Sequence, residues 1–261
     1  MARQAPAHRP RKRFGQHFLH DPGVIERILQ AIAPAPGQAL VEIGPGQGAL
    51  TRPLLERAGA LQVIEIDRDL AASLAERLAG FPGLQVHRRD ALVVDFCALY
   101  PGRRDLRLVG NLPYNLSTPL LFHALEHIRC LQDMHFMLQK EVVARMAAAP
   151  GGKDYGRLSV MVQYHCRVQP LFDIGPGAFA PPPRVRSSLV RLTPHARPPV
   201  EVVDEARFAA IVRAAFGQRR KTLRNALQGL LEAHHIEAAG VDPSARAEQL
   251  DLAAFARLAN A

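Results

Sequence analysis

The stretch ALVEIGPGQGAL, residues 39–50, decides the fold that this sequence predicts. An apolar run of strand length leads into Gly44, Gly46 and Gly48, and a helical segment follows. Glycines at a strand end let the backbone approach a ligand closely, and open α/β sheets bind nucleotides at the carboxyl ends of their parallel strands. We therefore expect the first strand, loop and helix of a nucleotide-binding sheet.

The same alternation continues along the chain. Apolar runs typical of strands occupy residues 61–67, 84–90, 106–111 and 134–139, and helical segments lie near 49–58, 69–78 and from about 119 onward. Before them, Asp21 and Pro22 can start a helix. Strands rich in Val, Ile and Leu that alternate with helices indicate a parallel sheet covered on both faces. The predicted class is α/β, with a doubly wound and mostly parallel sheet.

The pattern changes after about residue 156. Residues 164–174 and 185–194 look like strands, and the sequence GPGAFAPPPR between them contains no crossover helix, so we expect an antiparallel pair at one sheet edge. From residue 204 the spacing is helical, with two apolar stripes: Phe208, Ile211, Val212, Ala215 and Phe216, then Leu223, Leu227 and Leu230. We predict a flexible basic arm over residues 1–13, an α/β domain over 14–195 and a small all-helical domain over 196–261.

The composition favours a polyanionic partner. Lys and Arg number 33 against 24 Asp and Glu, which gives a formal net charge of +9 and a sequence pI of about 10.2. No apolar run approaches the roughly 20 residues of a membrane-spanning helix, and no apolar segment of a secretory signal follows the basic N-terminus. We expect a cytoplasmic protein that has no membrane partner.

The three cysteines favour neither a disulfide framework nor a zinc site. Cys97, Cys130 and Cys166 are odd in number, widely spaced and form no CxxC pair. We expect three reduced thiols and no bound metal.

Two acidic residues follow the second and third predicted strands. Glu65 lies about 21 residues beyond Gly44, where a carboxylate can accept hydrogen bonds from both hydroxyls of a ribose, and Asp90 could accept one from an adenine amino group. A dinucleotide and S-adenosylmethionine both fit this geometry. However, a dinucleotide loop usually reads GxGxxG, and Pro45 removes an amide that could donate to a pyrophosphate. We therefore favour S-adenosylmethionine, and a methyltransferase over a dinucleotide oxidoreductase.

The loop after the fourth strand, in VGNLPYNLSTPLL (residues 109–121), suggests the acceptor of the reaction. The Asn111 side-chain oxygen and the Leu112 carbonyl could hold both N–H groups of an adenine amine, with its lone pair aimed at an electrophile. Pro113 would make the loop rigid, and Tyr114 would stack on a base that has left its helical stack. A helix cap explains residues 115–119 but leaves Asn111 and Tyr114 unexplained. Phe179 is the expected second wall for the base.

Together these residues resemble the KsgA/RsmA family of 16S rRNA adenine dimethyltransferases, a branch of the Rossmann-like class I methyltransferases that depend on S-adenosylmethionine. The resemblance covers nearly the whole chain beyond the basic arm. It is carried by RFGQHFLHD, VEIGPGQGALT, VIEID, GNLPYNLSTPLLFH, MHFMLQKEV, YGRLSV, FAPPPRVRSSLVRL and FGQRRKTLRNAL.

The resemblance implies a role for each matching position. His17 and Leu19 contact the cofactor, Gly44 and Gly46 lie in its glycine-rich loop, Glu65 holds the ribose, Asp90 holds the adenine, and Asn111 lies between cofactor and target base. The implied products are two methyl groups on each of two adjacent adenosines near the 3′ end of small-subunit rRNA, made during 30S subunit biogenesis. The implied partner is a 30S subunit or its precursor, and we expect a monomeric enzyme.

A basic cluster is the predicted contact with RNA. Arg220, Lys221 and Arg224 lie beside Arg213 and Arg219, and a helix would place Arg220 and Arg224 one turn apart on one face. Two alternatives stay open from the sequence. One is an RNA-binding ribosome assembly factor that has lost catalysis, and the other is a large-subunit rRNA adenine dimethylase.

Overall fold

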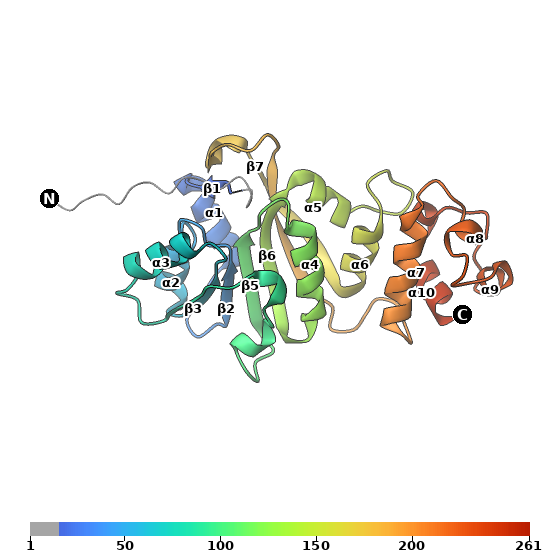
Figure 1. Ribbon diagram of the computed structural model, residues 1–261, viewed down its shortest axis with the longest axis horizontal. Helices are drawn as coiled ribbons and strands as arrows, with labels where there is room; N and C mark the ends of the chain where they lie inside the picture. The colour runs from blue at the N-terminus through green and yellow to red at the C-terminus, as the bar shows by residue number, and fades with distance from the viewer. Residues whose placement is uncertain (1–15) are drawn as a thin grey trace. The chain divides into compact units, whose positions relative to one another are not determined.

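The computed structural model describes residues 16–261 (Figure 1), so the basic arm predicted over residues 1–13 lies outside the described residues. Contacts divide the described chain into two compact units. The first comprises the residues up to Lys140 together with Pro170–Leu192, and the second comprises Glu141–Gln169 together with Thr193–Ala261. Helices of residues 141–169 therefore group with the C-terminal helices, whereas the predicted boundary fell near residue 195. That boundary, taken as the limit of a functional domain, stays a prediction.

Most residues of a seven-stranded sheet belong to the first unit, and the strand order is β4-β3-β2-β5-β6-β9-β7. The strands are β2 (Leu40–Ile43), β3 (Leu61–Ile64), β4 (Leu84–His87), β5 (Leu106–Asn111), β6 (Leu131–Gln139), β7 (Cys166–Ile174) and β9 (Ser187–Pro194). The pairs from β4 to β6 are parallel, and β9 runs antiparallel to β6. The predicted doubly wound sheet with an antiparallel edge is confirmed. Its strand order reverses between β2 and β5, which is where such sheets bind ligands.

Helices follow the strands as the apolar periodicity predicts. The first unit contains α1 (Pro22–Ile32), α2 (Thr51–Ala58), α3 (Arg68–Arg77) and α4 (Ser117–Glu126), with short turns η2 (Ala91–Val93), η3 (Cys97–Leu99), η4 (Ile128–Cys130) and η5 (Pro176–Ala178). Asp21 caps α1 by accepting a hydrogen bond from Val24 N, and Asp67 caps α3. The central strands have fully buried apolar side chains, such as those of Leu40, Val41 and Leu61. The sheet of the first unit is thus buried in apolar core.

A second, two-stranded sheet was not predicted. Strand β1 (Phe18–Leu19) pairs antiparallel with β8 (Phe179–Ala180). Two-residue strands are too short to produce a visible alternation of apolar residues, so the sequence pattern contains no sign of them. This small sheet brings the segment that contains His17 back to the main sheet.

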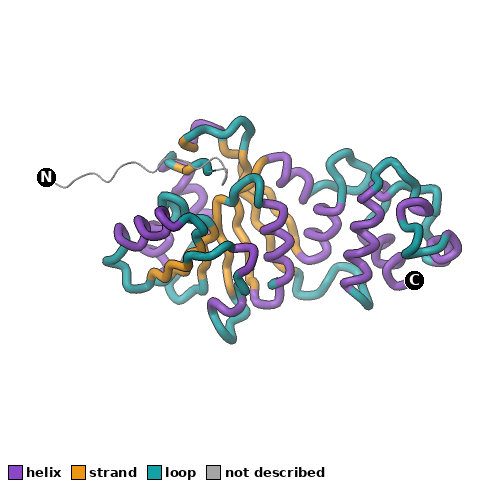
Figure 2. Tube along the Cα trace, in the orientation of Figure 1, coloured by secondary structure: helices purple, strands orange, loops and turns teal. Residues whose placement is uncertain are grey.

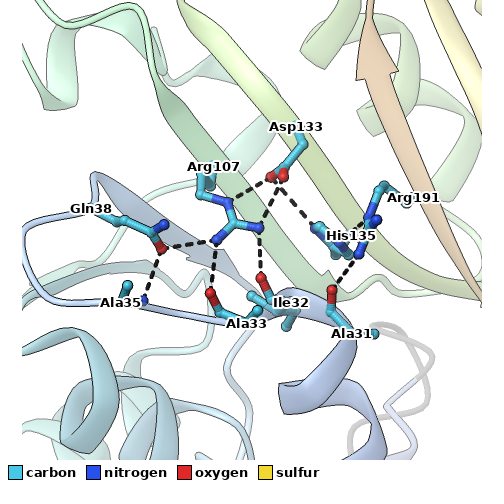
Figure 3. Close-up of polar contacts among 9 residues, drawn as sticks. All are labelled: Ala31, Ile32, Ala33, Ala35, Gln38, Arg107, Asp133, His135 and Arg191. Carbon is cyan, nitrogen blue, oxygen red and sulfur yellow. Dashed lines mark hydrogen bonds and ion pairs between the residues drawn. The ribbon is translucent and has the colours of Figure 1, made fainter.

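A buried polar network holds the end of α1 against the sheet (Figure 3). Arg107 on β5 donates two hydrogen bonds of 2.9 Å to the Asp133 carboxylate on β6 and a third, of 2.7 Å, to the Ile32 carbonyl. Arg191 on β9 donates to the Ala31 carbonyl. Helix α1 ends with unpaired carbonyl groups, and these two guanidinium groups satisfy two of them inside the protein. The start of β5 and the end of α1 are therefore tied together.

Two of the three cysteines are oxidised, which corrects the prediction of reduced thiols. Cys97 in η3 and Cys130 in η4 form a disulfide with a Cα–Cα distance of 5.7 Å, across 33 residues of sequence. Cys166 is a buried free thiol, and burial raises its pKa to about 12. The spacing argument failed because the fold brings two short turns together that no sequence motif connects.

The second unit consists mainly of helices, and Figure 2 shows the end of the chain as helices and loops. Its helices are α5 (Lys140–Met146, of which Lys140 belongs to the first unit), α6 (Arg157–His165), α7 (Glu205–Gly217), α8 (Leu223–Ala226), α9 (Ala233–Ala238), η6 (Ala247–Gln249) and α10 (Leu252–Asn260). Both α6 and α10 pack against α7. The buried stripe of α7 matches its prediction, except that Phe216 is partly exposed. In the second predicted stripe Leu223 and Leu227 are fully buried, but Leu230 is 49% exposed because α8 ends at Ala226.

Candidate active site

The glycine-rich loop lies between β2 and α2. Its three glycines have positive φ angles of 66°, 55° and 81°, a region that L side chains rarely adopt. Space is limited as well, because a Cβ atom at Gly46 would lie 3.0 Å from the Phe18 ring, and one at Gly48 would lie 2.6 Å from Leu74. The loop therefore forms a tight turn beneath the N-terminal segment.

Glu65 is held in place by this loop. Its Oε2 accepts a hydrogen bond from Gly46 N at 3.1 Å, and its Oε1 accepts one from Asp67 N at 2.9 Å. The side chain is buried, and burial raises its pKa, against the opposing effect of the backbone donors of Asp67, Gly46 and Ile66. The carboxylate of Glu65 is thus oriented by backbone groups, while each of its oxygens keeps a second lone pair.

Two neighbouring elements complete this edge of the sheet. Asp90 follows β4, and its Oδ1 accepts a hydrogen bond from Leu92 N at 3.0 Å. Ile66, directly after Glu65, is 43% exposed, which is unusual for a large apolar side chain of this protein. Both residues line the pocket that also contains Glu65. An apolar surface between two carboxylates suits a flat ring with polar edges.

Glu42 is a site residue that the sequence analysis missed. It lies on β2, lines the same pocket and is only 2% exposed, and its Oε2 accepts no hydrogen bond from any residue that the structure describes. Burial is the main reason that its pKa rises to about 8; the nearby Thr51 side chain opposes this rise and the charge of Glu65 adds to it. The sequence did offer one sign of Glu42, which is an acidic residue within the apolar strand VEIG.

The NLPY loop forms the opposite wall of the pocket. Asn111 Nδ2 donates a hydrogen bond of 2.9 Å to the His17 carbonyl, and Leu112 N donates one of 3.2 Å to Met137 O. The bond to His17 uses one of the two N–H donors of the Asn111 amide and fixes its nitrogen, and the side-chain oxygen is the acceptor that the amide can offer a ligand. The His17 ring lies 5.4 Å from the Tyr114 ring at an angle of 30°, and its Nδ1 donates to the Pro181 carbonyl at 2.8 Å.

The pocket brings together most of the predicted site residues. It is lined by His17, Leu19, Gly44, Gly46, Glu65, Asp90, Asn111, Leu112, Pro113 and Tyr114. Phe179 is not among the lining residues, since it is 2% exposed and packs in the apolar core. The structure therefore does not place Phe179 as a wall for a base, because β8 turns its side chain inward. Residues 16–261 contain no group of three or more His, Cys, Asp or Glu side chains arranged to hold a metal ion.

The predicted basic cluster lies in the second unit. Arg220, Lys221 and Arg224 are all exposed, but residues 218–222 form a turn between α7 and α8. The prediction that Arg220 and Arg224 share one helical face is therefore wrong, because the helix begins only at Leu223. Arg219 is already paired, with Nε 3.0 Å from Glu248 Oε2.

The chain has a mostly parallel sheet whose strand order reverses beside a glycine-rich loop, with carboxylates at successive strand ends and the NLPY loop facing them. This fold and site place it among the Rossmann-like class I methyltransferases. The comparisons give the particular branch. The family model for "Ribosomal RNA adenine dimethylase" matches residues 7–261, and the chain belongs to this family.

Relatives and solved structures agree with this placement. "Ribosomal RNA small subunit methyltransferase A" of Pseudomonas aeruginosa is 61% identical over 97% of this chain and 94% of its own length, and the protein of the same name in Xanthomonas campestris is 61% identical over 98% and 96%. A dimethyladenosine transferase from Plasmodium falciparum superposes with a TM-score of 0.75 at 26% identity, over 93% of this chain and 96% of its own. The 23S rRNA methyltransferase ErmE superposes with a TM-score of 0.69 at 28% identity, over 93% and 98%. The chain is an enzyme of the methyltransferase class.

Proposed function

We propose that this protein transfers methyl groups from S-adenosylmethionine to the exocyclic amines of two adjacent adenosines near the 3′ end of small-subunit (16S) rRNA, giving dimethyladenosines during assembly of the 30S subunit. The observation that carries this proposal is the position of the Asn111 amide. It lines the pocket of Glu65 and Asp90, and its nitrogen is tied to the His17 carbonyl, so that its oxygen is left for an amine.

The residues of the pocket fit the proposed cofactor. Glu65, fixed by two backbone donors, would hold the ribose hydroxyls, and Asp90 would accept from the adenine amine. Glu42 offers this pocket a buried oxygen that no residue of the described range 16–261 satisfies, which is the kind of group that a polar ligand satisfies. His17, Leu19, Gly44 and Gly46 would complete the contacts. When bound, the cofactor supplies an electrophilic methyl group on a positively charged sulfur.

The NLPY loop would prepare the nucleophile. The nitrogen lone pair of an adenine amine is delocalised into the ring, so the amine attacks poorly unless its geometry changes. The Asn111 oxygen and the Leu112 carbonyl would accept its two N–H groups and favour a pyramidal nitrogen whose lone pair points into the pocket. Pro113 would limit movement of the loop, and Tyr114 would stack on the base. The methylated nitrogen is positively charged and loses its proton readily, so no strong base is required.

The second unit would bind the RNA backbone. Arg220, Lys221 and Arg224 are exposed cations on a turn and a short helix, which suits contact with phosphate groups. Arg213, exposed on α7, is a further cation of this unit. We place the reaction in the cytoplasm, on a 30S subunit or its precursor, with the protein acting as a monomer without a membrane partner. No described helix is both long and apolar enough to cross a bilayer.

Large-subunit rRNA is the second candidate substrate, because the 23S rRNA methyltransferase ErmE has the same fold over 93% of this chain. The sequence identities favour the small subunit, at 61% to the named small-subunit enzymes against 28% to ErmE. An RNA-binding factor without catalysis is less well supported, since simple binding does not require the Asn111 arrangement.

The test is to incubate unmodified small subunits, and separately large subunits, with the protein and S-adenosylmethionine, and to measure the methylated nucleosides by mass spectrometry. We expect dimethyladenosine only in a 3′-end fragment of small-subunit rRNA. Asn111→Ala should reduce the rate about 100-fold or more while RNA binding is kept. The control is Asn115→Ala, because Asn115 is exposed in the same loop and does not line the pocket. Methylation confined to large subunits, or an active Asn111→Ala variant, would contradict the proposal.

A further inference from the structure

The hydroxyl of Tyr114 makes a contact that the proposed reaction does not use. It lies 2.6 Å from Ser187 Oγ, so the two hydroxyl groups share a hydrogen bond. The residues are 73 positions apart, and both belong to the first compact unit. Ser187 is 0% exposed and Tyr114 is partly buried. The serine end of the bond is therefore shielded from water, and the low polarity around it strengthens a hydrogen bond between neutral groups.

Ser187 is the fixed end of this hydrogen bond. It is the first residue of β9 and pairs with Gln139 of β6, and the preceding Arg186 carbonyl accepts from Lys140 N at 2.9 Å. The NLPY loop, by contrast, leaves the strand pairing of β5 with β6 after Asn111, although Leu112 N still donates a hydrogen bond of 3.2 Å to Met137 O of β6. A regular sheet thus presents a hydroxyl group to an irregular loop.

The bond restricts the ring of Tyr114. A tyrosine side chain has two torsion angles, so its ring plane is set once both the backbone and the hydroxyl are held. The ring lines the pocket beside Asn111 and lies 5.4 Å from the His17 ring. Burial raises the pKa of Tyr114, against the effect of the Ser187 bond, so the hydroxyl remains neutral and positions the ring rather than transferring a proton.

We propose that Ser187 is a positioning residue for the target adenine, which holds the Tyr114 ring in the orientation that receives the base. This inference rests on the proposed function, in which Tyr114 stacks on that base. Ser187 touches no substrate and acts only through the Tyr114 hydroxyl. A ring that is ordered before the RNA binds loses less conformational entropy on stacking, so more of the stacking energy is available to hold the base at Asn111.

The kinetic test is a double-mutant cycle with unmodified small subunits and saturating S-adenosylmethionine. Ser187→Ala should lower the methylation rate about threefold to tenfold, the range of one buried neutral hydrogen bond, with a smaller change in KM. Tyr114→Phe should lower it by a similar factor, and Tyr114→Phe with Ser187→Ala should be no slower than Tyr114→Phe alone. If the two single effects multiply in the double variant, Ser187 does not act through the hydroxyl and the inference is wrong.

A second measurement needs neither cofactor nor activity. The protein contains four tyrosines, and incorporation of 3-fluorotyrosine gives four ¹⁹F resonances, of which that of Tyr114 is assigned by its loss in Tyr114→Phe. Ser187→Ala should shift the Tyr114 resonance and average its ring orientations, while the other three resonances stay in place. The matched control is Ser188→Ala. Ser188 is also buried, but as the next residue of β9 its side chain points to the opposite face of the strand, where it donates to Asp173 of β7. This variant should leave the Tyr114 resonance and the methylation rate unchanged.

The two measurements separate failure of this inference from failure of the proposed function. A wild-type protein that methylates no adenosine would overturn the proposed function and, with it, the role of Ser187. An active wild type whose Tyr114 resonance and rate are unaffected by Ser187→Ala would overturn the inference alone.

Discussion

At the scale of single residues, Glu42 makes the stability of this protein depend on pH. Its pKa is about 8 in the folded chain, against 4.5 for the free side chain. Between these values the unfolded chain has lost a proton that the folded protein keeps, so the free energy of unfolding falls as pH rises. The slope is about 1.4 kcal/mol per pH unit for one group.

Glu42→Gln should remove this slope, because the amide cannot ionise. We expect urea unfolding at pH 5, 6, 7 and 8 to show the variant gaining stability over the wild type as pH increases. Glu56→Gln on α2 is the matched control, since Glu56 is exposed and paired with Arg52. Parallel curves for Glu42→Gln and the wild type would show that Glu42 is already ionised in the folded state.

At the scale of elements, an ion pair links β5 to β6 through Arg107 and Asp133. Its contribution to stability depends on its burial rather than on the pairing of charges alone. Arg107 and Asp133 form a two-pronged pair whose side chains are 6% and 12% exposed, and Arg103 and Asp105 form a similar pair at 40% and 49%. Asp133→Ala should lower the free energy of unfolding by about 3–5 kcal/mol, because it leaves a buried guanidinium without its partner. Asp105→Ala should have a much smaller effect.

Chemical denaturation of both variants at neutral pH measures this difference, and equal losses would contradict it. The stability of the wild type and of Asp133→Ala at acid pH provides a second check. For Asp133, burial raises the pKa, but the bonds from His135 and Arg107 outweigh it and bring the pKa below 3.8. The stability that Asp133 contributes is therefore present above this value and is lost as pH falls through the lowered folded pKa. The free energies of unfolding of the wild type and of Asp133→Ala should therefore converge in acid.

At the scale of the whole molecule, the +9 charge matters only where it is exposed and unpaired. Alanine at Arg220, Lys221 and Arg224 together should weaken binding to small subunits. It should also reduce the slope of log K against log salt by about 2–3, because binding releases fewer counterions when each phosphate contact is lost. Filter binding at several salt concentrations measures both quantities.

The matched control removes the same number of charges elsewhere. Arg52, Arg68 and Arg103 are also exposed, but each is paired with a neighbouring carboxylate of the first unit. Their replacement by alanine should leave the salt slope almost unchanged. If both triple variants reduce the slope equally, net charge rather than this cluster governs binding.

Local patterns were enough to predict much of this protein. Alternating apolar runs predicted the order of strands and helices, and GPGQG, Glu65, Asp90 and NLPY predicted one pocket, because strand ends of a parallel sheet meet at one edge. Where no local pattern exists, prediction failed. Strands β1 and β8 are too short to alternate, and the turn after α7 interrupts a spacing that resembled a helix.

The sequence by itself therefore determined the class of fold, the family and most of the pocket residues, since these depend on periodicity and on short motifs. Only the tertiary structure decided the Cys97–Cys130 disulfide, the pKa of Glu42 and the bond between Tyr114 and Ser187. The physical reason is the same for all three. A contact across 33 or 73 residues, or the loss of water around a carboxylate, depends on which distant segments pack together, and no local spacing of side chains contains that information.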